Sequence, residues 1–360
     1  MSRIRIKNFG PIKDGFQENG GWIDIDKITI FIGNQGSGKS TIAKLISTFT
    51  WIEKALVRGD YDSKWFSRKN KLKNQFLNYH RLENYLVKKN GKTISEIEYQ
   101  GEAYQITFKD DVLNTQEIKN TQYSLPQIMY VPAERNFISY VKSLKELKLS
   151  SDSLKEFLTE FDNAKDSIKG SISLPINNVD LEYDKLNDIL NIKGTDYKVR
   201  LTESSSGFQS LVPLYIVSQY LASGVKKRTE SNLDSMTSEE LERFKESISE
   251  IYSNNSLTGE QRRAAVSALS SKFNKTCFIN IVEEPEQNLF PISQKDMLNS
   301  LLEFNNYNKE NKLIITTHSP YLLNHLSIAI KAGNLLEKKN INKEEISKII
   351  PVRSAILNQS

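Results

Sequence analysis

A nine-residue segment near the start of the chain, residues 33–41, constrains the fold more than any other part of the sequence. Its letters, G-N-Q-G-S-G-K-S-T, fit the pattern G-x-x-x-x-G-K-[ST] of a phosphate-binding loop. The apolar, β-branched run at residues 28–32 predicts a buried strand before it, and the residues after it can continue as a helix. Glycines at such a junction let successive backbone N–H groups turn inward around phosphate oxygens. We therefore expect a strand–loop–helix unit that binds a nucleotide, rather than a glycine-rich turn without a ligand.

Two side chains of this loop have specific expected tasks. Lys39 would reach the β- and γ-phosphates, and the hydroxyl of Ser40 would ligate Mg²⁺. The expected cofactors are therefore ATP and Mg²⁺. The residues expected to contact the nucleotide from this loop are Asn34, Gln35, Gly36, Ser37, Gly38, Lys39, Ser40 and Thr41.

A run of carboxylates follows a second apolar strand, at residues 277–282. The strand ends in E-E-P-E, which places Glu283, Glu284 and Glu286 at its mouth. Glu283 would hold Mg²⁺, and Glu284 would orient or deprotonate the attacking water. Three carboxylates within four residues repel one another, so a cation at this position would stabilise them. An acidic turn without a function is the alternative.

A third apolar strand, at residues 313–317, ends in a histidine. His318 could reach a γ-phosphate and sense its loss if this strand lies beside the strand of the phosphate loop. The alternative is a histidine that only packs or caps. His80 and His325 lack a comparable context, and we expect them to be structural.

A cluster of small polar residues precedes an apolar helix at residues 211–221. Ser205, Ser206 and Gly207, with Gln209 behind them, predict a second anion site at a helix N-terminus, on a different part of the surface. An ordinary serine cap is the alternative reading of these residues. Their position between the phosphate loop and the carboxylate run favours the anion site.

The composition fits a globular protein, with 360 residues of which 38% are apolar and 26% charged. No run approaches the roughly 18 apolar residues that define a membrane-spanning helix, and no signal-peptide pattern opens the chain. A single cysteine, Cys277, excludes an internal disulfide and suits a reducing cytoplasm. The net charge of +5 permits a nucleic-acid partner without requiring one, and basic runs at residues 68–73 and 226–228 could contact DNA. We expect a cytoplasmic protein with no membrane partner.

Periodicity outlines the remaining elements. Strands are expected at residues 3–8 and 128–131, with a hairpin at 94–108. Helical patterns cover residues 42–73, 139–168 and 224–275, the last of these polar and charged.

The order of the motifs resembles that of the ABC-type ATPases of the SMC, RecF and OLD group. In that resemblance residues 205–209 are similar to the signature motif, residues 286–291 to the D-loop, His318 to the switch histidine and residues 4–9 to the first strand. It implies an α/β fold: an ABC-type P-loop ATPase head with a mixed sheet core and a helical subdomain that carries the signature. Residues 1–135 with 276–360 would form the nucleotide-binding core, and residues 136–275 the subdomain, with an inserted segment at 224–275.

Departures from the common ABC pattern refine this resemblance. Most ABC proteins carry Asp-Glu where this chain has Glu283 and Glu284, and the E-E-P-E form is similar to the OLD-like branch, common in bacterial anti-phage defence. The N-terminal third is most similar to the ATPase subunit of the PARIS defence system. Residues 130–136 fall where a Q-loop is expected but contain no glutamine, so Glu134 and Arg135 are candidate Mg²⁺ or phosphate contacts. We expect neither the long coiled coil nor the Toprim domain of some relatives in this sequence.

The resemblance implies an ATPase whose catalytic residues are Lys39, Glu284 and His318, working as a homo-oligomer. In a head-to-tail sandwich, Ser206 and Gly207 of one copy would complete the ATP site of the other. The implied function is a slow regulatory ATPase in anti-phage defence, which controls a separate effector such as a nuclease or toxin. A RecF- or SMC-like ATPase that clamps DNA is the alternative, so DNA is a candidate partner. A transporter ATPase fits less well, because such subunits usually carry Asp-Glu.

Overall fold

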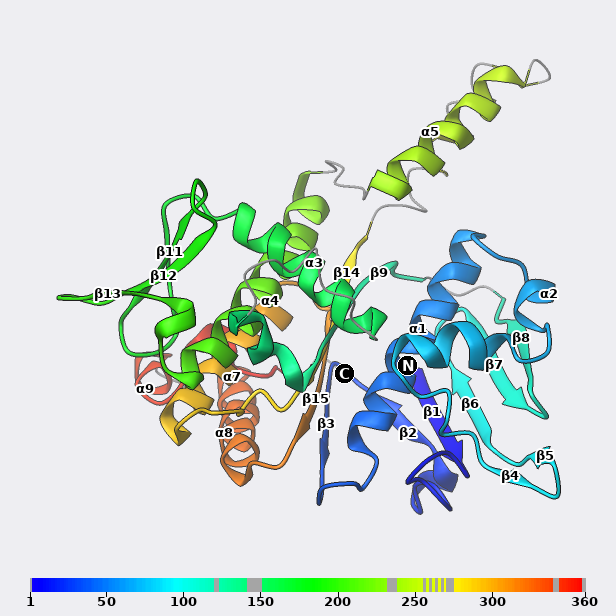
Figure 1. The fold of residues 1–360 in the computed structure, drawn as a ribbon, viewed down its shortest axis with the longest axis horizontal. Helices are drawn as coiled ribbons and strands as arrows, with labels where there is room; N and C mark the ends of the chain where they lie inside the picture. Colours follow the sequence, from blue (N-terminus) through cyan, green and yellow to red (C-terminus); the bar gives the residue numbers. More distant parts are fainter. Residues whose placement is uncertain are drawn as a thin grey trace.

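A four-stranded parallel sheet forms the centre of the protein, which we describe from a computed structural model. The structure describes residues 2–119, 123–140, 151–231, 238–254, 257–258, 261–262, 265–266, 269, 275–338 and 343–357. Within them, the central sheet runs through the middle of the molecule (Figure 1). Its strand order is β3 (Ile28–Ile32), β15 (Lys312–Thr317), β14 (Cys277–Glu283) and β9 (Pro126–Val131).

This sheet is buried on both faces, which explains why its strands read as unbroken apolar runs. Ile128, Tyr130 and Ile281 pack into the core around α1 (Lys39–Arg58). Their neighbours Met129 and Val282 pack into a second core on the opposite face. That second core is built largely from α3 (Asp152–Asp166), α4 (Ser206–Ser231), α7 (Pro291–Asn305) and α8 (Pro320–Leu336).

An antiparallel sheet packs on the α1 side (Figure 1). Its order is β2 (Ile23–Ile25), β1 (Ser2–Lys7), β6 (Glu96–Gln100), β7 (Tyr104–Lys109) and β8 (Val112–Glu117). The first strand and the hairpin were predicted from the sequence. The third strand of the meander was not, although Asp110 and Asp111, with φ angles of 51° and 62°, form the kind of tight turn that joins paired strands. The sequence led us to expect one mixed sheet in the core. The structure instead has a parallel sheet and a separate antiparallel sheet.

The helical run expected at residues 42–73 divides into three pieces. Helix α1 ends at Gly59, whose left-handed φ of 74° stops it. Asp62 then caps α2 (Ser63–Phe66) by accepting the N–H of Trp65 at 2.7 Å. A π-helix, η2 (Leu72–Leu77), follows.

The region at residues 136–275 is less helical than expected. Besides α3, α4 and α5 (Ser238–Ser253), it contains an antiparallel sheet whose apolar residues Leu181, Leu190 and Ile192 face the second core. Their alternation was the available signal for strands. The sheet consists of β10 (Ser171–Ser173), β11 (Asp180–Asp184), β12 (Ile189–Lys193) and β13 (Lys198–Arg200). Residues 141–150 of the predicted helical arm lie outside the described residues.

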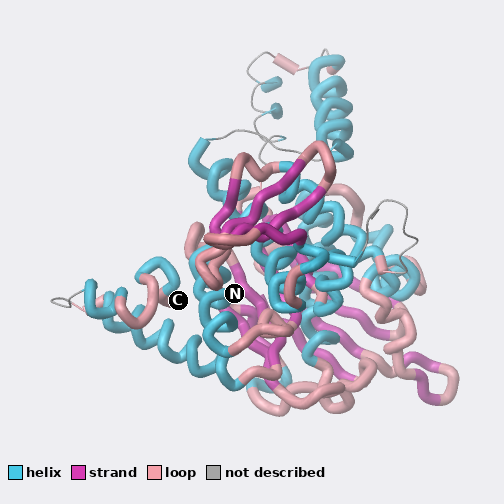
Figure 2. Tube along the Cα trace, turned by 60° about the vertical axis from the view of Figure 1, so that its left-hand side comes forward, coloured by secondary structure: helices cyan, strands magenta, loops and turns pink. Residues whose placement is uncertain are grey.

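Helix α5 extends away from the rest of the protein in both views (Figures 1 and 2). None of the helices in the described ranges is both long and apolar enough to cross a membrane. The remaining short elements are η1 (Asn19–Gly21), β4 (Lys88–Lys89), β5 (Lys92–Thr93), η3 (Ala133–Tyr140), η5 (Leu201–Glu203), α9 (Lys343–Ser347) and η6 (Val352–Ser354).

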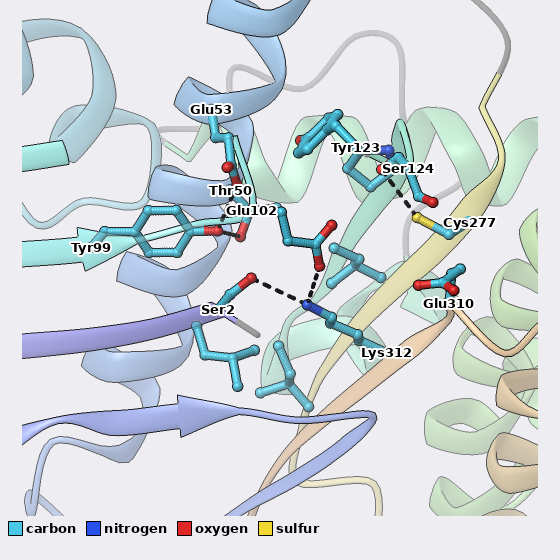
Figure 3. A pocket seen from close by; sticks show the side chains of 14 residues that line it. Ser2, Thr50, Glu53, Tyr99, Glu102, Tyr123, Ser124, Cys277, Glu310 and Lys312 are labelled. Atoms are coloured by element: carbon cyan, nitrogen blue, oxygen red, sulfur yellow. Dashed lines mark hydrogen bonds and ion pairs between the residues drawn. The ribbon is translucent and has the colours of Figure 1, made fainter. Parts of the chain in front are cut away.

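Buried polar contacts join the sheets at the amino ends of the parallel strands (Figure 3). Glu53 of α1 accepts hydrogen bonds from the Tyr99 hydroxyl at 3.0 Å and from the N–H of Ala103 at 2.7 Å, and its burial raises its pKa. Gly101 lies so close that an added Cβ would be 2.1 Å from the Glu53 carboxylate. Lys312 of β15 completes the network by bonding Glu102 at 3.1 Å.

Candidate functional site

The three strand-end motifs meet at one edge of the parallel sheet. Strand pairing sets Thr317 beside Ile32, and Glu283 beside Thr316. The phosphate loop, His318 and the carboxylate run therefore leave adjacent strands at their carboxyl ends. Open parallel sheets bind ligands at this edge.

The phosphate loop has the backbone geometry that its glycines permit. Gly36 and Gly38 adopt φ angles of 74° and 96°, which disfavour any residue with a side chain. A Cβ on Gly38 would also lie 2.9 Å from Cγ1 of Ile12. Asn34, Gln35, Gly36 and Ser37 are exposed at this edge.

Lys39 begins helix α1 and folds back over the loop. Its ammonium donates to the carbonyls of Gly33 at 2.8 Å and Asn34 at 2.9 Å. These bonds hold the positive charge at the start of the phosphate loop. Ser40 is half-buried, whereas Thr41 is 6% exposed and can offer only its backbone N–H to a ligand.

Glu283 is the carboxylate that fits a cation. It is 4% exposed, and Oε2 accepts the N–H of Ala133 at 3.4 Å, whereas Oε1 is buried without a hydrogen-bond partner. Mg²⁺ typically binds proteins through one or two carboxylates and keeps waters and substrate phosphates as its other ligands. Glu283, with the hydroxyl of Ser40, therefore suits Mg²⁺ better than a metal that demands a full protein cage. No group of three or more His, Cys, Asp or Glu side chains forms such a cage among the described residues.

Glu284 and His318 face each other across the strand ends. The Oε1 atom of Glu284 lies 3.4 Å from Nε2 of His318, and both side chains are about one-third exposed. Glu284 has a φ of 44°, which is rare for a residue with a long side chain and is concentrated at functional sites. The pair thus presents a carboxylate and an imidazole to the open edge.

Glu286 has a role that sequence reasoning missed. One of its oxygens, Oε1, accepts both the Thr317 hydroxyl and the N–H of His318, each at 2.7 Å. Thr317 in turn accepts the N–H of Ser319 at 2.9 Å. Glu286 therefore holds the histidine-bearing loop against the carboxylate loop. A threonine before His318 was the only sequence signal of this contact.

The residues that resemble a signature motif differ in their exposure to solvent. Ser205 and Ser206 are exposed at the N-terminus of α4, and an added Cβ on Gly207 would lie 3.1 Å from the carbonyl of Asn288. Gln209 is different. It is 4% exposed, and its amide donates to the carbonyl of Ser204 at 3.0 Å and to that of Thr202 at 3.2 Å. Gln209 was expected to contact the nucleotide. The structure corrects this expectation, because its side-chain amide instead holds the loop together from inside the protein.

In the segment after β9, the two candidate Mg²⁺ or phosphate contacts, Glu134 and Arg135, differ in their exposure to solvent. Glu134 is exposed and keeps its place as a proposed Mg²⁺ contact. Arg135 is fully buried and donates to backbone carbonyls, so it is not free to meet a phosphate.

His80 is also buried, with its ring centroid 4.8 Å from that of Tyr130 in an edge-on contact. Burial, with Lys44 nearby, lowers the pKa of His80 to about 3.

The site consists of a glycine-rich loop between a strand and a helix, which fits the P-loop pattern, with carboxylates and a histidine on the two next strand ends. No protein-family model matches the chain, and no curated protein matches it. Among solved structures, an SMC head bound to the C-terminal winged-helix domain of ScpA is similar, with 12% identity, a TM-score of 0.36, and coverage of 90% of this chain and 91% of that one. The SMC head domain from Thermotoga maritima shows 13% identity and a TM-score of 0.32, with 90% of each chain covered. The roles of individual side chains rest on the geometry above and not on these similarities.

Proposed function

We propose that this protein is an ABC-type ATPase that hydrolyses ATP to ADP and phosphate with the help of Mg²⁺. One observation carries the proposal: Lys39, Glu283 and the Glu284–His318 pair leave neighbouring carboxyl ends of one parallel sheet. This arrangement surrounds a single position with a phosphate cradle, a cation ligand and a base.

Each residue has a defined part in the reaction. Lys39 and the loop N–H groups neutralise charge on the β- and γ-phosphates. The phosphate oxygens would take the place of the carbonyls that now accept hydrogen bonds from Lys39. Ser40 and Glu283 would hold Mg²⁺, which would supply positive charge against the phosphates. Glu284, which is exposed enough to meet water, orients the attacking water and accepts its proton. His318 would reach the γ-phosphate and sense its loss, with Nε2 beside Glu284.

A cavity of about 310 Å³ beside the loop suits the nucleoside. It is lined by Ser37 and Ile42 of the loop and α1, and by Ile12, Phe16 and Ile23. Its volume lies at the lower end of the range for ligand sites. Polar groups of Lys13, Asp14 and Gln17 share the lining, so the cavity could both cover a base and bind its polar edge while the phosphates reach the glycine-rich loop.

The exposed serines at the start of α4 support an ATP-sandwich homo-oligomer. Ser205, Ser206 and Gly207 lie at a helix N-terminus, which favours a negatively charged group. In the sandwich they would complete the site that Lys39 of another copy builds. The E-E-P-E run further supports a regulatory ATPase of the OLD-like, anti-phage kind, which acts on a separate effector in the cytoplasm.

A specific contact favours DNA clamping as a second candidate. Asp111 accepts the hydroxyl of Thr93 at 2.6 Å, and its carbonyl accepts the N–H of Asn70 at 3.2 Å. These bonds join the basic run at residues 68–73 to the hairpin β4–β5, which exposes Lys88, Lys89 and Lys92. A DNA clamp built on this surface should lose affinity steeply with added salt.

The substitution Glu284→Gln tests the proposal. It removes the base but keeps the shape, so the protein should bind ATP, hydrolyse it at least about 100-fold more slowly and accumulate as a dimer. Mass photometry with and without ATP measures the dimer, and phosphate release measures hydrolysis. Glu117→Gln, an exposed change at the end of β8, is the matched control and should behave as wild type. Hydrolysis by Glu284→Gln at the wild-type rate would remove this residue from the base role.

A further inference from the structure

Arg135 occupies an unusual position behind the candidate site. It follows β9 in η3, and its side chain is fully buried. Its guanidinium donates to the carbonyls of Glu283 and Glu284, each at 2.7 Å. It also donates to the carbonyls of Ser210 at 3.0 Å and Pro132 at 3.2 Å. One side chain thus holds backbone from three separate segments.

The chemistry of these contacts requires arginine. A guanidinium is a flat fork with five N–H donors, whereas a lysine ammonium is a point charge with three. Burial lowers the pKa of Arg135 to about 10, while the negative charges of Glu286, Glu284 and Glu283 oppose that shift. The side chain therefore remains a cation at neutral pH, fixed directly behind the carboxylate loop.

Two further contacts join the same segments independently of Arg135. The hydroxyl of Ser210, in α4, donates to the side-chain oxygen of Gln287 at 3.2 Å. One turn earlier, Gly207 approaches the carbonyl of Asn288 so closely that an added Cβ would lie 3.1 Å from it. The start of the signature helix is therefore fastened to the loop that follows β14.

We propose that Arg135 is a positioning residue that couples the Glu283–Glu284 loop of one nucleotide site to the signature segment, Ser205–Gly207, of the same chain. The inference rests on the proposed ATP sandwich, in which that signature segment serves the nucleotide of the partner copy. A shift of the carboxylate loop on hydrolysis is then carried through Arg135 to the second site. The two ATP sites of a dimer communicate by this route.

The test compares Arg135→Lys with Arg58→Lys, which is the same change at another mostly buried arginine, at the far end of α1. Lysine keeps the charge but cannot reach all four carbonyls. ATP affinity is measured at protein concentrations too low for dimers, because it reports on the phosphate loop alone. Single-turnover hydrolysis reports on the carboxylate side. ATP-dependent dimerisation in a Glu284→Gln background, where hydrolysis does not intervene, reports on the signature side.

Coupling predicts that Arg135→Lys leaves the ATP affinity within about twofold of wild type and weakens both other readouts by about tenfold, inside the usual range of coupling between sites. Arg58→Lys should leave all three readouts unchanged. A slower hydrolysis with normal dimerisation would confine Arg135 to the carboxylates and overturn the coupling. Loss of ATP affinity as well would show a general role in folding and overturn it too. If Glu284→Gln alone does not dimerise with ATP, the sandwich itself fails, which is a different result.

Discussion

Removal of the Glu286 carboxylate should release the loop that carries His318. In Glu286→Ala the Thr317 hydroxyl and the His318 N–H both lose their acceptor, and Thr317 is completely buried. The buried Thr317 hydroxyl left without a partner costs about 1–3 kcal/mol, and loss of the bond to the more exposed His318 N–H adds about 1 kcal/mol, so the free energy of unfolding should fall by about 2–4 kcal/mol. Glu286→Gln can keep an oxygen at the Oε1 position, where both bonds converge. Neutral hydrogen bonds are roughly half as strong, so this variant should lose only about 1–2 kcal/mol.

Urea denaturation and steady-state ATP hydrolysis together measure the effect. We expect Glu286→Ala to lose stability as calculated and to hydrolyse ATP about tenfold more slowly, because His318 and its partner Glu284 no longer share a fixed geometry. Its ATP affinity should stay near that of wild type, since the phosphate loop is untouched. Glu117→Ala serves as the control for loss of a surface carboxylate. A Glu286→Ala protein with stability within about 0.5 kcal/mol of wild type and normal turnover would refute the reasoning.

Three further predictions follow from the same geometry. Lys39→Ala should abolish ATP binding in an equilibrium titration, because no other side chain of the loop supplies its charge; binding that persists contradicts the assignment. Gly38→Ala should lower the thermal midpoint more than Gly36→Ala, because both positions have positive φ but only Gly38 would also meet Ile12, at 2.9 Å; equal effects would argue against that contact. His80 is neutral in the fold, with a pKa of about 3 against about 6.5 unfolded, so the unfolded state binds the proton first and stability falls as the pH drops from about 6.5 toward 3. We expect a loss on the order of 2 kcal/mol by pH 5 in wild type, and a smaller loss in His80→Phe; equal slopes would contradict this account.

Local patterns in the sequence predicted the elements that carry chemistry. The apolar runs before Gly33, Glu283 and His318 identified three strands, because a parallel strand buried on both faces can carry few polar side chains. Alternation also predicted the hairpin of β6 and β7. The four strands of residues 171–200 were missed, since they are short and lie among charged residues in a region that read as helical.

The sequence by itself determined which chemical groups this protein brings to its site: a glycine-rich phosphate loop, a pair of carboxylates and a histidine, each placed directly after a strand. Only the tertiary structure decided how they act together. Pairing of β15 between β3 and β14 sets His318 next to Glu284, and it lets Glu286 hold the histidine loop. The same folding buries Arg135 against carbonyls from residues far apart in the chain. Hydrogen bonds to backbone carbonyls leave no mark on the sequence of the acceptor, because every residue has one. Contacts of this kind therefore became visible only in the fold.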